Sequence, residues 1–113
     1  MTLADERLRE LDNPSLTEGE RVLIRCRVAA DLIHKGQYEA AREALGELWL
    51  GVGHRPPVRR LPPAVNAEVL LRCGTLTHWL GNAGNVSGAQ EQAKDMLSEA
   101  ARIFRAEGMP AKV

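Results

Sequence analysis

The sequence has few cysteines and no excess of charge of either sign. Its two cysteines, Cys26 and Cys73, are far apart in the chain and belong to no paired motif. Neither a disulfide framework nor a cysteine-ligated zinc site is therefore indicated. Basic and acidic side chains balance at 15 each, so the basic excess that phosphate contacts usually require is missing. We do not expect nucleic acid among the partners of this chain.

The sequence also has no apolar run that approaches the length of a membrane span. Charged residues appear already between Met1 and Arg7. Both features argue against a secretory signal and a membrane anchor. We predict a cytoplasmic protein that has no membrane partner.

Residue patterns typical of catalysis or metal binding are missing as well. His34, His54 and His78 form no metal-binding pair and have no carboxylate beside them at ligand spacing. The glycine-rich segment 81–88 precedes a helical pattern, but it lacks the lysine and the preceding strand of a phosphate-binding loop. No nucleophile–base pair or pair of carboxylates stands out. We expect neither an enzyme nor a metal or other cofactor.

Helical periodicity, by contrast, occurs four or five times along the chain, and strand alternation does not occur. A length of 113 residues fits one domain. We predict an all-α fold of about five helices in a single domain, residues 1–113, built from antiparallel hairpins. The expected parts are a leading helix (3–12), a first hairpin (18–50), a proline-rich crossover (51–63) and a second hairpin (64–107).

Local signals place the ends of these helices. Residues 17–20, Thr-Glu-Gly-Glu, form a capping box that starts the first helix of the first hairpin. Gly36 is expected to end that helix, and Tyr38 to begin the next, which should run to about Leu50. Because only two or three residues join the two helices, they must be antiparallel.

The second hairpin is less sharply marked. Four prolines exclude a helix interior from the crossover, and the next helix is predicted to run to about Leu80. A loop over 81–88 leads to the last helix, which starts at Ala89 and closes at Gly108. Both cysteines fall on apolar stripes, so we expect them to be buried and unpaired.

The crossover and the tryptophans allow two interpretations each. Arg55, Arg59 and Arg60 lie among the prolines; a stiff connector is the favoured interpretation, but the arginines could contact a phosphate or a carboxylate. Trp49 and Trp79 lie near the ends of their helices. Core packing is favoured for both, although tryptophan is also enriched at binding hot spots.

The first hairpin resembles a tetratricopeptide repeat. The resemblance rests on residues 36–41, Gly-Gln-Tyr-Glu-Ala-Ala, followed by Leu45 and Leu48. The second hairpin matches more loosely, and the spacing of 45 residues between Gly36 and Gly81 exceeds the family period of about 34 residues; the proline-rich crossover accounts for the excess. As a whole, the chain is similar to the N-terminal segment of bacterial tetratricopeptide proteins. The residues of the second hairpin that resemble the tetratricopeptide pattern are Cys73-Gly74, Leu80-Gly81, Ala93, Leu97 and Ala100.

This resemblance implies a protein-binding scaffold. In the family, the first helix of each hairpin lines a concave groove that holds a peptide or a helix of a partner protein. Carried over by position, the groove of the second hairpin presents Glu68, Leu71, Thr75 and His78, and that of the first presents Leu23, Cys26, Ala30 and Ile33. Either the leading helix covers the apolar strip of the first hairpin or the strip is the binding surface.

Self-association is the alternative to binding another protein. The last helix is apolar on more than one side and no further repeat follows it. An exposed apolar face would then pair with a second copy, giving a homodimer, or with the next unit of a longer array. The residues expected on this face are Met96, Ile103 and Phe104.

Overall fold

The computed structural model describes residues 9–108. Within that range the chain forms four α-helices, two short 3-10 helices and no strand, which confirms the all-α class. Most of the leading helix predicted at 3–12 lies outside the described residues. The elements are η1 (Glu10–Asp12), α2 (Glu18–His34), α3 (Tyr38–Leu45), η2 (Gly46–Leu48), α4 (Pro63–Ala83) and α5 (Ala89–Ala106).

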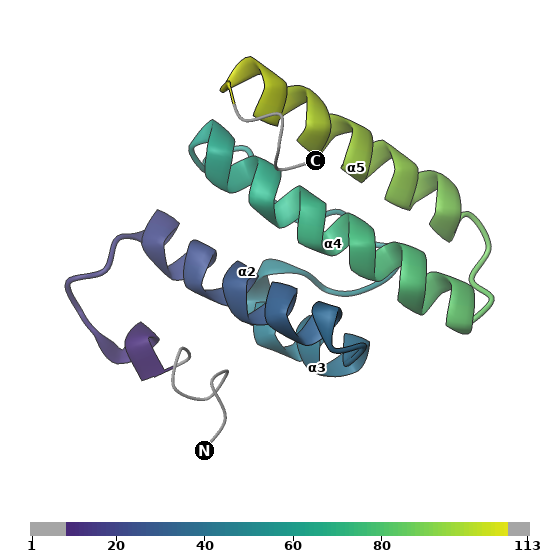
Figure 1. Cartoon of the computed structure of the whole chain (residues 1–113), viewed down its shortest axis with the longest axis horizontal. Coiled ribbons are helices and arrows are strands. Elements are labelled where there is room, and N and C mark those ends of the chain that lie inside the picture. Colours follow the sequence, from purple (N-terminus) through teal and green to yellow (C-terminus); the bar gives the residue numbers. More distant parts are fainter. Residues whose placement is uncertain (1–8, 109–113) are drawn as a thin grey trace.

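Helix α4 is the central element. It packs against α2, α3 and α5; α5 runs antiparallel along one side of it, and α2 lies along another (Figure 1). Its buried residues are spread around the helix and include Leu70, Cys73 and Leu76. A helix that is apolar on most of its circumference needs such neighbours on several sides. No helix in residues 9–108 is long and apolar enough to span a membrane.

Two of the predicted helix boundaries are confirmed by their hydrogen bonds. At the start of α2, the Glu20 amide donates to the Thr17 hydroxyl (3.1 Å), and the Thr17 amide donates to the Glu20 carboxylate (3.0 Å). At its end, Gly36 adopts a φ of 76°, and the Gln37 amide donates to the Leu32 carbonyl (2.8 Å). Both ends are specified by short-range sequence signals.

Helix α3 is shorter than predicted, because it ends at Leu45 rather than near Leu50. Arg25 of α2 reaches over this point and donates to the Ala44 carbonyl (3.2 Å). Gly46 turns the chain with a φ of 58°, and a Cβ there would lie 2.8 Å from the Arg25 guanidinium. The positive φ at this turn is a conformation that glycine adopts without strain.

Helix α4 is longer than predicted, because it continues through Gly81 to Ala83. The first glycine assigned to the loop is thus a helical residue. Its role is steric: a Cβ at Gly81 would lie 2.4 Å from the Ala89 Cβ, and one at Gly74 would lie 2.9 Å from Leu97 Cγ. The two glycines let α5 approach α4 closely.

In the structure the crossover comprises residues 49–62, because η2 ends at Leu48 and α4 begins at Pro63. It begins with Trp49 and returns across the bundle to α4 (Figure 1). The Trp49 side chain is buried in the core, and its indole N–H donates to the His54 carbonyl (2.9 Å). The core role predicted for this tryptophan is confirmed. The hydrogen bond also fixes the first part of the crossover against the helices.

Candidate partner-binding surface

Two of the residues predicted to line the groove on α2, Leu23 and Ile33, pack against the hydrophobic core. Leu23, Ala30 and Ile33 are half-buried, and their spacing places them on one stripe of the helix. Cys26, on the edge of the same stripe, is buried and close enough to Glu68 of α4 for the two to interact electrostatically. We call this stripe, together with the groove side of α4, the α2–α4 surface. On α4 it comprises Leu71, Thr75, His78 and Trp79.

Glu68 does not present its carboxylate to a partner, contrary to the groove prediction. The residue is 9 % exposed, and its carboxylate accepts a hydrogen bond from the Arg72 guanidinium one turn later (3.2 Å). Burial, reinforced by the Glu68 carboxylate and opposed by Arg72, raises the pKa of the Cys26 thiol to about 12. Glu68 and Arg72 thus belong to the α2–α4 interface, where they form an ion pair.

The other predicted groove residues of α4 remain at the surface, but their polar groups are engaged within the fold. The Thr75 hydroxyl donates to the Leu71 carbonyl (2.7 Å). His78 is exposed; its Nδ1 lies 2.6 Å from Gln90 Oε1, and the Gln90 amide nitrogen donates to the His78 carbonyl (3.1 Å). What these positions offer a partner is mainly apolar contact, to which the half-buried Leu71 contributes.

Trp79 is the most prominent residue of this surface, and the expectation that it packs in the core is wrong. It is 43 % exposed. Its ring stacks on Tyr38 of α3 (centroids 5.4 Å apart, planes within 6°) and meets the edge of the His78 ring at 5.0 Å. Its indole N–H has no hydrogen-bond partner among residues 9–108. Trp79 therefore presents both apolar area and a free donor.

A signal for the exposure of Trp79 was present in the sequence. The apolar stripe predicted for this helix passes through Val65, Cys73 and Leu80, which lie on its packed sides. Trp79 does not share that stripe; its helical spacing places it above Thr75 on the groove side instead. The position of an aromatic residue on the helical wheel is therefore more informative than its hydrophobicity.

The apolar face predicted for self-association is not exposed in the described chain. Met96 and Phe104 are both 0 % exposed, because α5 turns them into the core against α4, and Ile103 is half-buried. The prediction of an uncovered face is therefore wrong for Met96 and Phe104. The outer side of α5 is polar instead, with exposed Lys94, Asp95, Ser98, Arg102 and Arg105.

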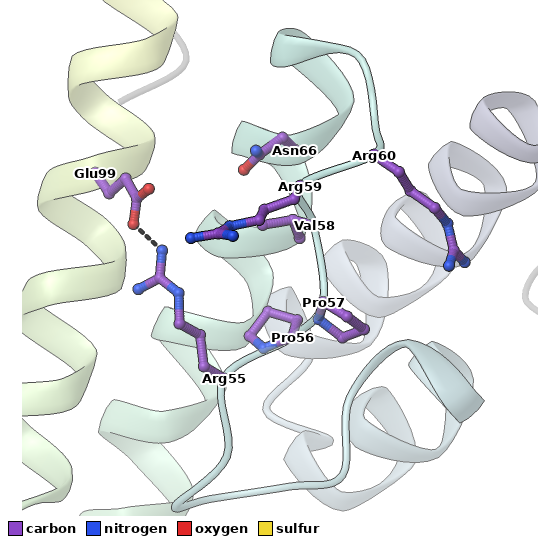
Figure 2. A pocket seen from close by; sticks show the side chains of 8 residues that line it. All are labelled: Arg55, Pro56, Pro57, Val58, Arg59, Arg60, Asn66 and Glu99. Carbon is purple, nitrogen blue, oxygen red and sulfur yellow. Dashed lines mark hydrogen bonds and ion pairs between the residues drawn. The ribbon is translucent and has the colours of Figure 1, made fainter.

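A hollow of about 660 Å³ lies between the crossover, the first turn of α4, and α5. Arg55, Arg59 and Arg60 of the crossover all contribute to its lining, together with Asn66 and Glu99 (Figure 2). Arg55 forms an ion pair with Glu99 across it. The sequence prediction of a stiff connector did not anticipate that Arg55 and Arg59 extend into one cavity, with Arg60 at its edge directed toward Glu18.

Among residues 9–108, no group of three or more histidine, cysteine or acidic side chains is placed to hold a metal ion. Comparison of the chain with models of known protein families, with curated proteins and with solved structures finds no match. Function must therefore be argued from the residues of this chain themselves.

Proposed function

We propose that this chain is a protein-interaction scaffold that binds a peptide or a helix of a partner protein without catalysing a reaction. The partner would lie on the α2–α4 surface, with the two helical hairpins stacked as in a tetratricopeptide array. One observation carries the proposal: Trp79 stands 43 % exposed on a Tyr38 ring that holds it in place.

The physical chemistry of Trp79 suits a binding anchor. Tryptophan provides a large contact area at low entropic cost, and it is among the residues most enriched at interface hot spots. Stacking on Tyr38 fixes its ring before a partner arrives, so little conformational freedom is lost on binding. The free indole N–H can donate to a backbone carbonyl of a bound segment. Further along the same surface, the half-buried Leu23, Ile33 and Leu71 supply apolar contact.

This surface favours a partner segment with a large apolar side chain to pack against Trp79. The predicted groove residues Thr75 and His78 lie next to it and keep their polar groups bonded within the fold. Covering the Thr75 hydroxyl and His78 Nδ1 therefore does not cost the partner the desolvation of an unpaired polar atom. Glu68 plays no part in this proposal, because it is paired with Arg72.

The test is selection of peptides on the folded chain, followed by titration of variants. Phage-displayed random peptides are selected on the wild-type chain, and labelled synthetic copies of the selected peptides are titrated by fluorescence anisotropy. We expect Trp79→Ala to weaken binding about tenfold or more, as truncation of a hot-spot residue does. Circular dichroism establishes that the variant remains folded.

Val86→Ala is the matched control. Val86 is exposed to nearly the same degree, 45 %, but it lines a separate hollow beside Gly53 and Ser87. Its truncation should leave the affinity of the selected peptides unchanged. A selection without binders, or binders that tolerate Trp79→Ala as well as Val86→Ala, would rule out this surface as the binding site.

A further inference from the structure

The hollow beneath the crossover, here called the crossover hollow, combines apolar walls with unequal charge. Pro56 and Val58 are buried along its crossover side. Figure 2 shows the guanidinium groups of Arg55 and Arg59 extending from the crossover into the space beside α5. Glu99 of α5 is the acidic residue of its lining. This combination differs from the α2–α4 surface, and it requires a separate explanation.

The charges of the crossover hollow do not cancel. Glu99 pairs with Arg55 and also lies 3.9 Å from Arg102. Arg60 turns away from the hollow, as Figure 2 shows, and pairs with Glu18 of α2 (2.7 Å). Arg59 has neither a hydrogen bond nor an ion pair with any other residue in the range 9–108. Its positive charge is therefore available to a ligand in the hollow.

The first turn of α4 adds further capacity for an anion. Its N-cap is Pro62, which has no side chain to cap the helix, and no acidic residue follows in the first turn. The positive end of the helix dipole is thus uncompensated. In the same turn, Asn66 Oδ1 is buried without a hydrogen-bond partner in the described part of the chain. A side-chain amide can present its NH₂ group after rotation, so Asn66 can donate to a ligand.

We propose that the crossover hollow binds the carboxylate of an organic acid that has an apolar body. Arg59 would hold the carboxylate in a two-pronged contact, which its planar guanidinium suits, and Asn66 would donate beside it. The apolar body would lie against Pro56 and Val58. A volume of about 660 Å³ suits a small organic ligand. The same chemistry is found in a free acid and in the C-terminus of a peptide.

The experiment is NMR titration of the ¹⁵N-labelled chain, with the Arg59 and Asn66 side-chain resonances as reporters. The probes are 4-phenylbutyrate, its neutral alcohol 4-phenylbutanol, inorganic phosphate, and the tripeptide Gly-Gly-Phe with a free or an amidated C-terminus. We expect 4-phenylbutyrate to bind in the millimolar range, as a ligand of this size permits. The alcohol and inorganic phosphate should each bind about tenfold more weakly, since each lacks one of the two recognised parts.

The carboxylate can come from a small organic acid or from the C-terminus of a protein, and the two Gly-Gly-Phe peptides distinguish these sources. Tighter binding of Gly-Gly-Phe with a free C-terminus than of 4-phenylbutyrate, lost on amidation, assigns a protein C-terminus. Binding of 4-phenylbutyrate alone assigns a small acid. Equal binding of 4-phenylbutyrate and 4-phenylbutanol would overturn the proposal, as would absence of binding by every carboxylate.

Three variants locate the site. Arg59→Ala should weaken 4-phenylbutyrate binding about tenfold, whereas Arg60→Ala removes the same charge from the neighbouring residue and should change it by about twofold at most. Asn66→Asp keeps the shape of the side chain but adds a negative charge, so binding should be lost. The same change suits the positive end of a helix, so thermal unfolding should show no loss of stability. Equal effects of Arg59→Ala and Arg60→Ala, or unchanged binding by Asn66→Asp, would overturn the site.

Discussion

The side of a helix on which a residue lies decides how deeply it is buried and how reactive its side chain is. Cys26 and Cys73 are buried on facing sides of α2 and α4, and both are free thiols. Burial raises the pKa of both groups, and that of Cys26 reaches about 12. Thiolates are the reactive form of cysteine, so both side chains act as small core residues. The sequence prediction of buried, unpaired cysteines is confirmed.

The raised pKa of Cys26 predicts how stability changes at alkaline pH. The folded state holds the thiol proton more tightly than the unfolded state, whose pKa is near 9.0. The contribution of the protonated Cys26 thiol to the free energy of unfolding is therefore fully present below pH 9. It is lost as the pH rises toward about 12, at up to about 1.4 kcal/mol per pH unit for one such group. Urea unfolding over this range should show a shallower decline for Cys26→Ala than for wild type. Parallel declines would show that the thiol is not shielded.

At the scale of helices, close packing of α5 on α4 depends on two glycines. Alanine in place of a glycine within a helix usually stabilises it by about 0.5–1 kcal/mol. At Gly81, the added Cβ would lie 2.4 Å from the Ala89 Cβ, and at Gly74 it would lie 2.9 Å from Leu97 Cγ. Overpacking of this kind costs about 1–3 kcal/mol. We predict that Gly74→Ala and Gly81→Ala both lower the free energy of unfolding measured in urea.

Gly19→Ala provides the matched control for these two variants. Gly19 is also helical, in α2, but its added Cβ would meet only Val65 Cγ2, at an ordinary 3.8 Å. This substitution should leave stability unchanged or raise it by a few tenths of a kcal/mol. If all three substitutions stabilise the chain equally, α4 and α5 do not approach as closely as described.

Some helix boundaries could be predicted from the sequence and others could not. The start of α2 at Thr17 and its end at Gly36 depend on neighbouring residues, so short-range patterns sufficed. At the end of α3, Arg25 of another helix donates to the Ala44 carbonyl, and the helical Gly81 lies against Ala89 of α5. Such long-range contacts leave no local pattern in the sequence. A glycine predicts a helix end whether it actually turns the chain or lies within a helix and lets another helix pack closely.

The candidate site was predictable only in part for a related reason. Helical spacing places Leu71, Thr75 and His78 on one side of α4, but it could not show that Glu68 is paired with Arg72. Helix α5 carries two apolar stripes, and the sequence alone did not decide which of them faces the core. Packing on α4 buries Met96 and Phe104, so two of the three residues expected to bind a second copy lie in the core.

At the scale of the whole molecule, the described residues form one compact helical body with a polar outer side on α5. The Cα radius of gyration is 13.6 Å, close to the roughly 13 Å of a compact domain of about 100 residues. Exposed Lys94, Asp95 and Arg102 make the outer side of α5 polar. In our proposal, another protein binds instead to the α2–α4 surface with Trp79.

Multi-angle light scattering after size-exclusion chromatography tests most directly whether that surface is open to a different protein rather than to a second copy. We predict a mass of 12.4 kDa that does not change as the protein concentration is raised. Trp79→Ala should have the same mass, because no contact between copies depends on this residue. A wild-type dimer that Trp79→Ala converts to a monomer would contradict the proposal, since it would show that the α2–α4 surface binds another copy of the chain.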